Sequence, residues 1–378
     1  MQTSVASSTA PGSRIEEAAF DVAKFASQQA ESAERDRRLS AEAVEAVLDA
    51  GFARHFVPRR WAGDEGTFAS LLQAVSVVGQ GCTSMAWAAS LTASLSRMAA
   101  YLPQQGRATL WADGPDTLIV GALMPLGRAR RTDDGWQVSG TWPYVSVVDH
   151  ADWALVCAVT TETVPRARFF ALPRGSFRTD DTWTSMGMRG TGSNSLTAQE
   201  VWVADHLSFD RDTLVAGPAE GAEAACHRVP LKAVNGLCFA APALGAARGA
   251  LAVWSETTAP RFVSSSGGLS PSAATVLARS SGEIDAAALL LERVARAADQ
   301  EEVSALTTTR SGRDCALAAE LAVSAVDRLF AAAGTRAHQD GAPLQRHWRD
   351  VHTAAGHVVL AFDPAAEAYA SQLFAGEG

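Results

Sequence analysis

Side chains suited to chemistry concentrate in one stretch near the C-terminus, LQRHWRDVHTAAGHVVL (Leu344–Leu360). At helical period, Arg346, Asp350, Thr353 and His357 fall in one stripe, with apolar side chains around them. Burying charge is costly, and an imidazole can hold or transfer a proton near neutral pH. The stretch is therefore predicted to be a helix whose polar stripe serves a function.

Simpler interpretations stay open for this stretch. Arg346 and Asp350 are four residues apart, the spacing of an ordinary helix ion pair, and His357 would then be a hydrogen-bonded core histidine. Metal binding is not expected, because His347, His352 and His357 are each five residues apart. That spacing turns successive rings away from one another, whereas a helical zinc site uses histidines four residues apart.

Two further segments bring hydrogen-bonding groups to the ends of predicted strands. SGTWPYVS ends at Ser146, whose hydroxyl is well placed for a ligand. MGMRGTGSNS (Met186–Ser195) joins glycines, which permit close backbone approach, to the polar side chains of Thr191, Ser193 and Asn194. It contains Gly-x-Gly, but a strand follows it, so a Rossmann site is not predicted. Aromatic packing in the first segment, or a plain turn in the second, would also explain these patterns.

The hydrophobic periodicity predicts a mainly α fold with a central β domain. Helices are expected at 14–35, 40–50, 68–78, 83–101, 103–111, 229–256, 271–299, 314–333, 344–360 and 364–373. Strands are expected at 117–123, 136–142, 152–159, 167–172 and 195–203, with a hairpin turn at Asp133-Asp134-Gly135. The predicted division is a disordered N-terminus at 1–13, a helical domain at 14–114, a β domain at 115–212 and a C-terminal four-helix bundle at 213–378.

Composition excludes several classes of protein. The 378 residues are 47% hydrophobic with a net charge of −9, enough to bury a large core. Basic residues are scattered among acids, so neither nucleic acid nor an anionic membrane is an expected partner. Five widely spaced cysteines without a CxxC pattern indicate reduced thiols. With no apolar run near eighteen residues and no apolar core in the N-terminal segment, the protein is expected to be cytoplasmic.

Taken together, the order of the predicted domains, SGTWPYVS, GMRGTGSNS and RHWRDVHTAAGH resemble one family of enzymes. These are the oxygenase components of two-component flavin-dependent monooxygenases on the acyl-CoA dehydrogenase fold, similar to 4-hydroxyphenylacetate 3-hydroxylase oxygenase and dibenzothiophene monooxygenase. The resemblance covers nearly the whole chain from about Arg14. It implies a homotetramer that receives reduced FAD or FMN, with FADH2 slightly favoured, from a separate flavin reductase. O2 is the co-substrate, no metal is used, and a small aromatic substrate is hydroxylated through a flavin C4a-hydroperoxide.

The same resemblance implies roles for individual residues. Ser146 is expected near flavin N5 and His357 near C4a, with His352 the competing candidate for the histidine role. Flavin-binding residues are expected at Trp142, Tyr144, Ser146, Trp183, Arg189, Thr191, Ser193, Asn194, Arg279, Arg346 and Arg349, with Arg279 supplied by a neighbouring subunit.

Other functions within this fold remain alternatives. An acyl-CoA dehydrogenase would need a glutamate where this chain has Val358, and no carboxylate stands between Asp350 and Asp363. Oxidation at nitrogen or sulfur is possible within the family, and a flavin-binding homologue without activity is the non-enzymatic alternative. Two departures bear on these choices: Val147 where relatives often have glycine, and no histidine in the helix expected at 83–101.

Overall fold

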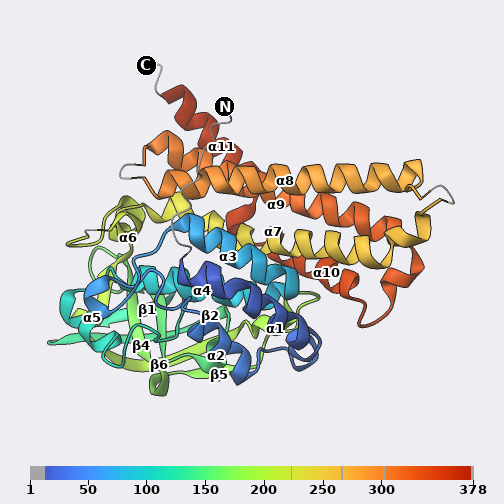
Figure 1. Cartoon of the computed structure of the whole chain (residues 1–378). Helices are drawn as coiled ribbons and strands as arrows, with labels where there is room; N and C mark the ends of the chain where they lie inside the picture. The colour runs from blue at the N-terminus through green and yellow to red at the C-terminus, as the bar shows by residue number, and fades with distance from the viewer. Residues whose placement is uncertain (1–12, 223, 265–266, 301–302, 376–378) are drawn as a thin grey trace, which may run out of the picture.

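The computed structural model describes residues 13–222, 224–264, 267–300 and 303–375 (Figure 1). A seven-stranded sheet lies on one side of the molecule, and long C-terminal helices run side by side on the other. The helices are α1 (Arg14–Asp36), α2 (Ala41–Asp49), α3 (Phe68–Gly81), α4 (Thr83–Ala99), α5 (Gln104–Leu110), α6 (Arg211–Ala216), α7 (Leu231–Thr257), α8 (Pro271–Ala298), α9 (Ala305–Ala333), α10 (Pro343–Ala355) and α11 (Phe362–Phe374). The strands are β1 (Ile119–Arg131), β2 (Gly135–Val145), β3 (Trp153–Thr160), β4 (Ala167–Pro173), β5 (Arg178–Asp180), β6 (Asn194–Ala204) and β7 (Ser208–Asp210). The predicted mainly α fold with a central sheet is confirmed, while the division into domains by residue number stays a prediction.

The register of the sheet brings the two predicted polar segments together. The strand order is β5-β6-β2-β1-β3-β4-β7, with β1 and β3 parallel and the other neighbours antiparallel. β2 pairs with β6 so that Val145 lies opposite Asn194. The residues that follow Val145 and those that precede Asn194 therefore meet at the same end of the sheet.

Helix α7 is the centre of the C-terminal bundle and packs against α3, α8, α9 and α10. Among the described helices it is the one long and apolar enough to cross a membrane, yet 78% of its most apolar window is buried inside the protein. A core helix has that composition for packing reasons, because its apolar side chains face neighbours on all sides. The burial identifies α7 as the core helix of the bundle.

The contact between α3 and α7 depends on two glycines. A methyl group added at Gly245 would lie 2.7 Å from the Cα of Gly79 and 2.8 Å from the carbonyl oxygen of Ser76. We therefore expect Gly245→Ala to lower the free energy of unfolding by about 2 kcal/mol, because the two helices must move apart. In Gly282→Ala, where α8 leaves open space, helix propensity should instead stabilise the protein by up to about 1 kcal/mol. Urea unfolding followed by tryptophan fluorescence measures both, and equal effects would mean that the close approach is not limiting.

Several predicted bounds are wrong in ways that have physical causes. β1 extends to Arg131 instead of ending at Leu123, because its polar second half is paired with β2. β5 and β7 are three residues each, too short to show a period, and were not predicted. α9 begins at Ala305, nine residues early, where the hydroxyl of Ser304 accepts from the backbone N–H of Thr307 at 3.1 Å. Of the predicted N-terminal segment, residues 1–12 lie outside the described residues.

The most consequential correction concerns the stretch predicted as one helix from Leu344 to Leu360. α10 ends at Ala355, and after Gly356 a separate 3₁₀ turn runs from Val358 to Leu360. His357 has extended backbone between the two and caps that turn. It therefore does not share a helical stripe with Arg346 and Asp350.

Candidate active site

Ser146 lies directly after β2 at the end of the sheet and is buried. Its hydroxyl oxygen accepts a hydrogen bond from Nε1 of Trp87, on α4, at 3.1 Å. It also lies 2.8 Å from the hydroxyl of Ser193, which precedes β6. The next residue, Val147, has φ of 60° and donates its N–H to the carbonyl of Thr191 at 2.8 Å. The backbone thus keeps a left-handed conformation that favours glycine, although the side chain is β-branched.

The hydroxyl groups of Ser146, Ser193 and Thr191 form a chain of hydrogen bonds in which every hydroxyl donates toward Met188. Thr191 donates to the carbonyl oxygen of Met188 at 2.8 Å, and its oxygen lies 2.6 Å from the hydroxyl of Ser193. A hydroxyl has a single proton, and the Trp87 N–H can only donate. Ser193 must therefore donate to Thr191, and Ser146 to Ser193. What Ser146 has left for a ligand is an acceptor lone pair.

His357, in the segment that follows α10, also contacts Trp87. Its ring stacks on Phe239 of α7, with centroids 3.8 Å apart, and meets Trp87 edge-on at 5.9 Å. Nδ1 accepts from the backbone N–H of Val359 at 3.3 Å, so the proton of a neutral ring sits on Nε2. Burial lowers the pKa of His357 to about 4, which keeps the imidazole neutral at pH 7. His357 therefore offers an N–H donor, and it contacts the same tryptophan as Ser146.

Trp87 contacts both residues, and the sequence did not predict this role. A tryptophan in an apolar helix fits a core position equally well. The hydroxyls of Ser90 and Ser94 on the same helix bond to the carbonyl and the thiol of Cys238 on α7. A buried Trp carries one N–H that needs an acceptor, and this was the available signal.

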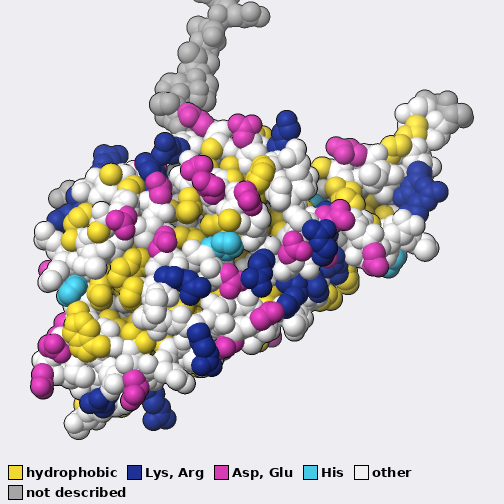
Figure 2. All heavy atoms as spheres, turned by 90° about the horizontal axis from the view of Figure 1, so that it is seen from below, with side chains coloured by type: hydrophobic (Ala, Val, Ile, Leu, Met, Phe, Trp, Pro, Cys, Tyr) yellow, Lys and Arg dark blue, Asp and Glu magenta, His cyan; other side chains and the backbone are white. Residues whose placement is uncertain are grey.

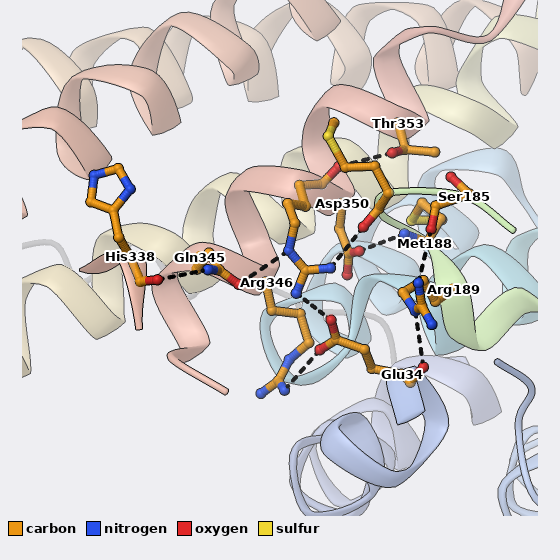
Figure 3. Close-up of polar contacts among 11 residues, drawn as sticks. Glu34, Ser185, Met188, Arg189, His338, Gln345, Arg346, Asp350 and Thr353 are labelled. Atoms are coloured by element: carbon orange, nitrogen blue, oxygen red, sulfur yellow. Dashed lines mark hydrogen bonds and ion pairs between the residues drawn. The ribbon is translucent and has the colours of Figure 1, made fainter. Parts of the chain in front are cut away.

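The loop that carries Met188 is clamped between α1 and α10 (Figure 3). Arg349 of α10 pairs with Glu34 of α1 and donates to the carbonyl of Met186 at 2.7 Å. Asp350 accepts from the N–H of Met188 at 2.6 Å, and burial raises its pKa to about 6. A methyl group at Gly187 would lie 2.2 Å from the carbonyl oxygen of Arg349, so only glycine permits this contact.

These contacts of Glu34, Arg349 and Asp350 with the loop, called the clamp below, engage the charged side chains of α10. Arg346 also pairs with Glu34, at 3.5 Å, so the ordinary ion pair between Arg346 and Asp350 is not formed. Arg189 donates to the backbone carbonyl of Glu34 at 3.2 Å and to that of Ser185 at 3.3 Å. Three of the four arginines predicted to contact flavin are thus engaged in contacts that join α1, α10 and this loop.

Other predicted site residues are placed apart from Ser146 and His357. Trp142, predicted to contact flavin, has its ring fully buried in the sheet core, and its Nε1 donates to the carbonyl of Cys157 at 2.7 Å. His352 points to α9, where Nε2 lies 2.8 Å from Oδ1 of Asp327. Arg279 is exposed on α8.

Three predicted residues shape the edge of the site. The side-chain oxygen of Asn194 accepts from the N–H groups of Thr182 and Trp183, both at 3.0 Å. The indole N–H of Trp183 donates to the carbonyl of Met188 at 3.0 Å. Tyr144, 73% exposed with φ of 63°, packs edge-on against Trp183. Aromatic surface is therefore available beside the hydroxyl chain.

Charge is mixed over the lower face of the molecule. Figure 2 shows arginines and carboxylates interspersed there, with hydrophobic side chains between them. In the described residues, no three His, Cys, Asp or Glu side chains gather as a metal would require. The five cysteines are buried and unpaired, and burial raises the pKa of Cys82 to about 11.

Comparisons with known proteins agree with this arrangement. Residues 237–362 match the family "Acyl-CoA dehydrogenase, C-terminal domain". Over 351 residues the chain is 31% identical to the flavin-dependent monooxygenase, oxygenase subunit HsaA, of Rhodococcus jostii, covering 89% of this chain and 91% of that protein. It is 27% identical to the oxygenase component of an FADH2-dependent resorcinol hydroxylase from Rhizobium, covering 94% and 92%.

A solved structure gives the same result. The crystal structure of the 3-HSA hydroxylase from Rhodococcus sp. RHA1 superposes with a TM-score of 0.91 at 28% identity, covering 96% of this chain and 97% of that one. The fold and the sequence are thus similar over most of both chains. The protein belongs to the flavin-dependent monooxygenase oxygenase subunits built on the acyl-CoA dehydrogenase fold.

Proposed function

We propose that this chain hydroxylates a small, electron-rich aromatic substrate, using O2 and a reduced flavin supplied by a separate reductase. The observation that carries the proposal is that two residues in contact with Trp87 offer complementary groups: an acceptor on Ser146 and an N–H donor on His357. The named activities of relatives, including resorcinol hydroxylase and p-hydroxyphenylacetate 3-hydroxylase, support an aromatic substrate.

The residues fit a reduced flavin. When bound, reduced flavin supplies the electrons that activate dioxygen. Ser146, with its free lone pair, would accept a hydrogen bond from the N5–H of the ring. His357 would offer its Nε2–H to negative charge that develops beside the ring. Trp87 and Phe239 pack apolar surface against the imidazole, which limits its contact with water.

The proposed oligomeric state, localisation and type of flavin rest on the family resemblance and on apolar residues exposed at the surface. A cytoplasmic homotetramer, with Arg279 reaching the flavin phosphate of a neighbouring subunit, would cover exposed apolar residues near the site, among them Tyr144, Met186 and Val358. Between the two flavins, FADH2 is slightly favoured, and a related structure from Streptomyces at 25% identity is a complex with FADH2.

The acyl-CoA dehydrogenase alternative lacks a base in this structure. Val358, at the position where that base would stand, is an exposed apolar side chain. Asp350 is buried and accepts from the Met188 N–H, so it holds the loop. Oxidation at nitrogen or sulfur shares the same flavin chemistry and is separated from ring hydroxylation by product analysis.

A stopped-flow experiment tests the function. The protein is mixed with anaerobically reduced FAD or FMN and then with oxygenated buffer, with and without resorcinol, p-hydroxyphenylacetate or indole-3-acetate as probes. We expect an absorbing phase distinct from reduced and oxidised flavin, and an oxygenated product with at least one probe. Flavin that oxidises in one phase, as it does in free solution, would contradict the proposal. Bound flavin that oxidises without product from any probe or from a wider set of phenols would favour a homologue without activity.

A further inference from the structure

The hydroxyl chain behind Ser146 has fixed ends. At one end is the indole N–H of Trp87, which can only donate, and at the other is the carbonyl of Met188, which can only accept. The Met188 end is itself held, because its N–H donates to Asp350 within the clamp (Figure 3). All members of the chain are buried, so water does not compete for these bonds.

We propose that this chain of hydroxyl groups, through Thr191 and Ser193, makes the site bind reduced flavin more tightly than oxidised flavin. The inference rests on the proposed function, in which Ser146 faces flavin N5. In reduced flavin N5 carries a proton and donates, whereas in oxidised flavin N5 has only a lone pair and accepts. Trp87, Ser193 and Thr191 are positioning residues, since they act on the flavin through Ser146.

Counting hydrogen bonds gives the size of the preference. With reduced flavin, all four internal hydrogen bonds are kept. Trp87 donates to Ser146, Ser146 to Ser193, Ser193 to Thr191, and Thr191 to the carbonyl of Met188. Ser146 also accepts a fifth hydrogen bond from N5–H. When Ser146 donates to oxidised N5, either its bond to Ser193 is lost, or Ser193 and Thr191 both turn their protons toward it and the bond from Thr191 to Met188 is lost. Either arrangement leaves four bonds. One buried neutral hydrogen bond corresponds to a preference of about five- to tenfold.

By the same count of hydrogen bonds, Thr191→Val removes the preference for reduced flavin. Without the Thr191 hydroxyl, both directions of the chain make three bonds, including the bond to flavin. The carbonyl of Met188 keeps two other donors, Nε1 of Trp183 at 3.0 Å and the Thr191 backbone N–H at 3.1 Å. Valine has nearly the shape of threonine, so the loop has no reason to rearrange. The matched control is Thr191→Ser, which keeps the hydroxyl and loses only a methyl group.

The test measures equilibrium binding rather than turnover. Dissociation constants for oxidised and anaerobically reduced flavin are determined by ultrafiltration for the unaltered protein and both variants. We expect the ratio of the oxidised to the reduced constant to fall about five- to tenfold in Thr191→Val and to stay within twofold in Thr191→Ser. A role in packing alone would weaken both flavin forms equally and leave the ratio unchanged.

The outcomes separate this inference from the proposed function. If flavin binds the unaltered protein and the ratio is the same in Thr191→Val and Thr191→Ser, the selection mechanism is wrong while the function stands. If the unaltered protein binds neither FAD nor FMN in either redox state, the proposed function itself fails.

Discussion

Replacing His357 with phenylalanine is expected to lower the yield of hydroxylated product per reduced flavin oxidised by about 100-fold, the usual cost of removing one donor to developing charge. Phenylalanine keeps the stacking on Phe239 and the edge contact with Trp87 but lacks Nε2–H. Flavin oxidation should continue and release hydrogen peroxide instead of product. Single-turnover reactions with product quantified by chromatography measure the effect, using whichever phenol the unaltered protein hydroxylates.

Two variants make this result specific. His352→Phe changes a histidine that bonds to Asp327 on α9, and its product yield should stay within about twofold of the unaltered protein, as for a surface change. His357→Gln restores an N–H donor without the ring and should recover part of the yield. If His352→Phe loses the product and His357→Phe does not, the assignment of the histidine is reversed.

The pH dependence gives an independent check on His357. Burial lowers its pKa to about 4, so the ring is neutral above that pH and gains a proton only below it. Product yield from the unaltered protein should therefore be flat from pH 8 to about 5 and decline near pH 4. An inflection near pH 6.5 that disappears in His357→Phe would show that the ring is solvated, contrary to its packing.

Glu34→Gln is expected to lower the free energy of unfolding by about 2 kcal/mol, somewhat less than for a fully buried ion pair. Glu34 pairs with Arg346 and Arg349, and only 15% and 16% of those two side chains is exposed. Neutralising Glu34 leaves two largely buried guanidinium groups without their carboxylate. α10 and the loop at 183–191 should loosen together, which would also weaken flavin binding.

Asp36→Asn is the matched control for Glu34→Gln. Asp36 also lies on α1 and pairs with Arg35, but that pair is well exposed, so its loss should cost less than about 0.5 kcal/mol. Urea unfolding followed by tryptophan fluorescence compares the two variants. Equal, small effects would mean that the clamp contributes little and that Met188 is held by its own loop.

Much of the site was predictable because it is local in sequence. The strand end at Ser146 and the glycine-rich segment before β6 follow from hydrophobic alternation and turn residues, which act over a few positions. Antiparallel pairing of the two strands then brings Ser146 to Ser193, because a fixed register sets which residues lie opposite each other.

Other features depend on contacts between distant parts of the chain. The sequence left His352 and His357 as competitors, and the end of α10 at Ala355 separates them: His352 turns to α9 and His357 to Phe239 and Trp87. Trp142 was expected at the flavin and lies in the sheet core. Periodicity shows which side of an element is apolar but not which neighbour covers it.

The sequence by itself determined the family, the order of helices and strands, and the polar segments that form the site. Tertiary structure alone decided the partners: Trp87 with Ser146, and Glu34 with two arginines more than 300 residues away. The physical reason is that a hydrogen bond or ion pair requires atoms within about 3 Å, and only the packed chain fixes such distances between residues far apart in sequence.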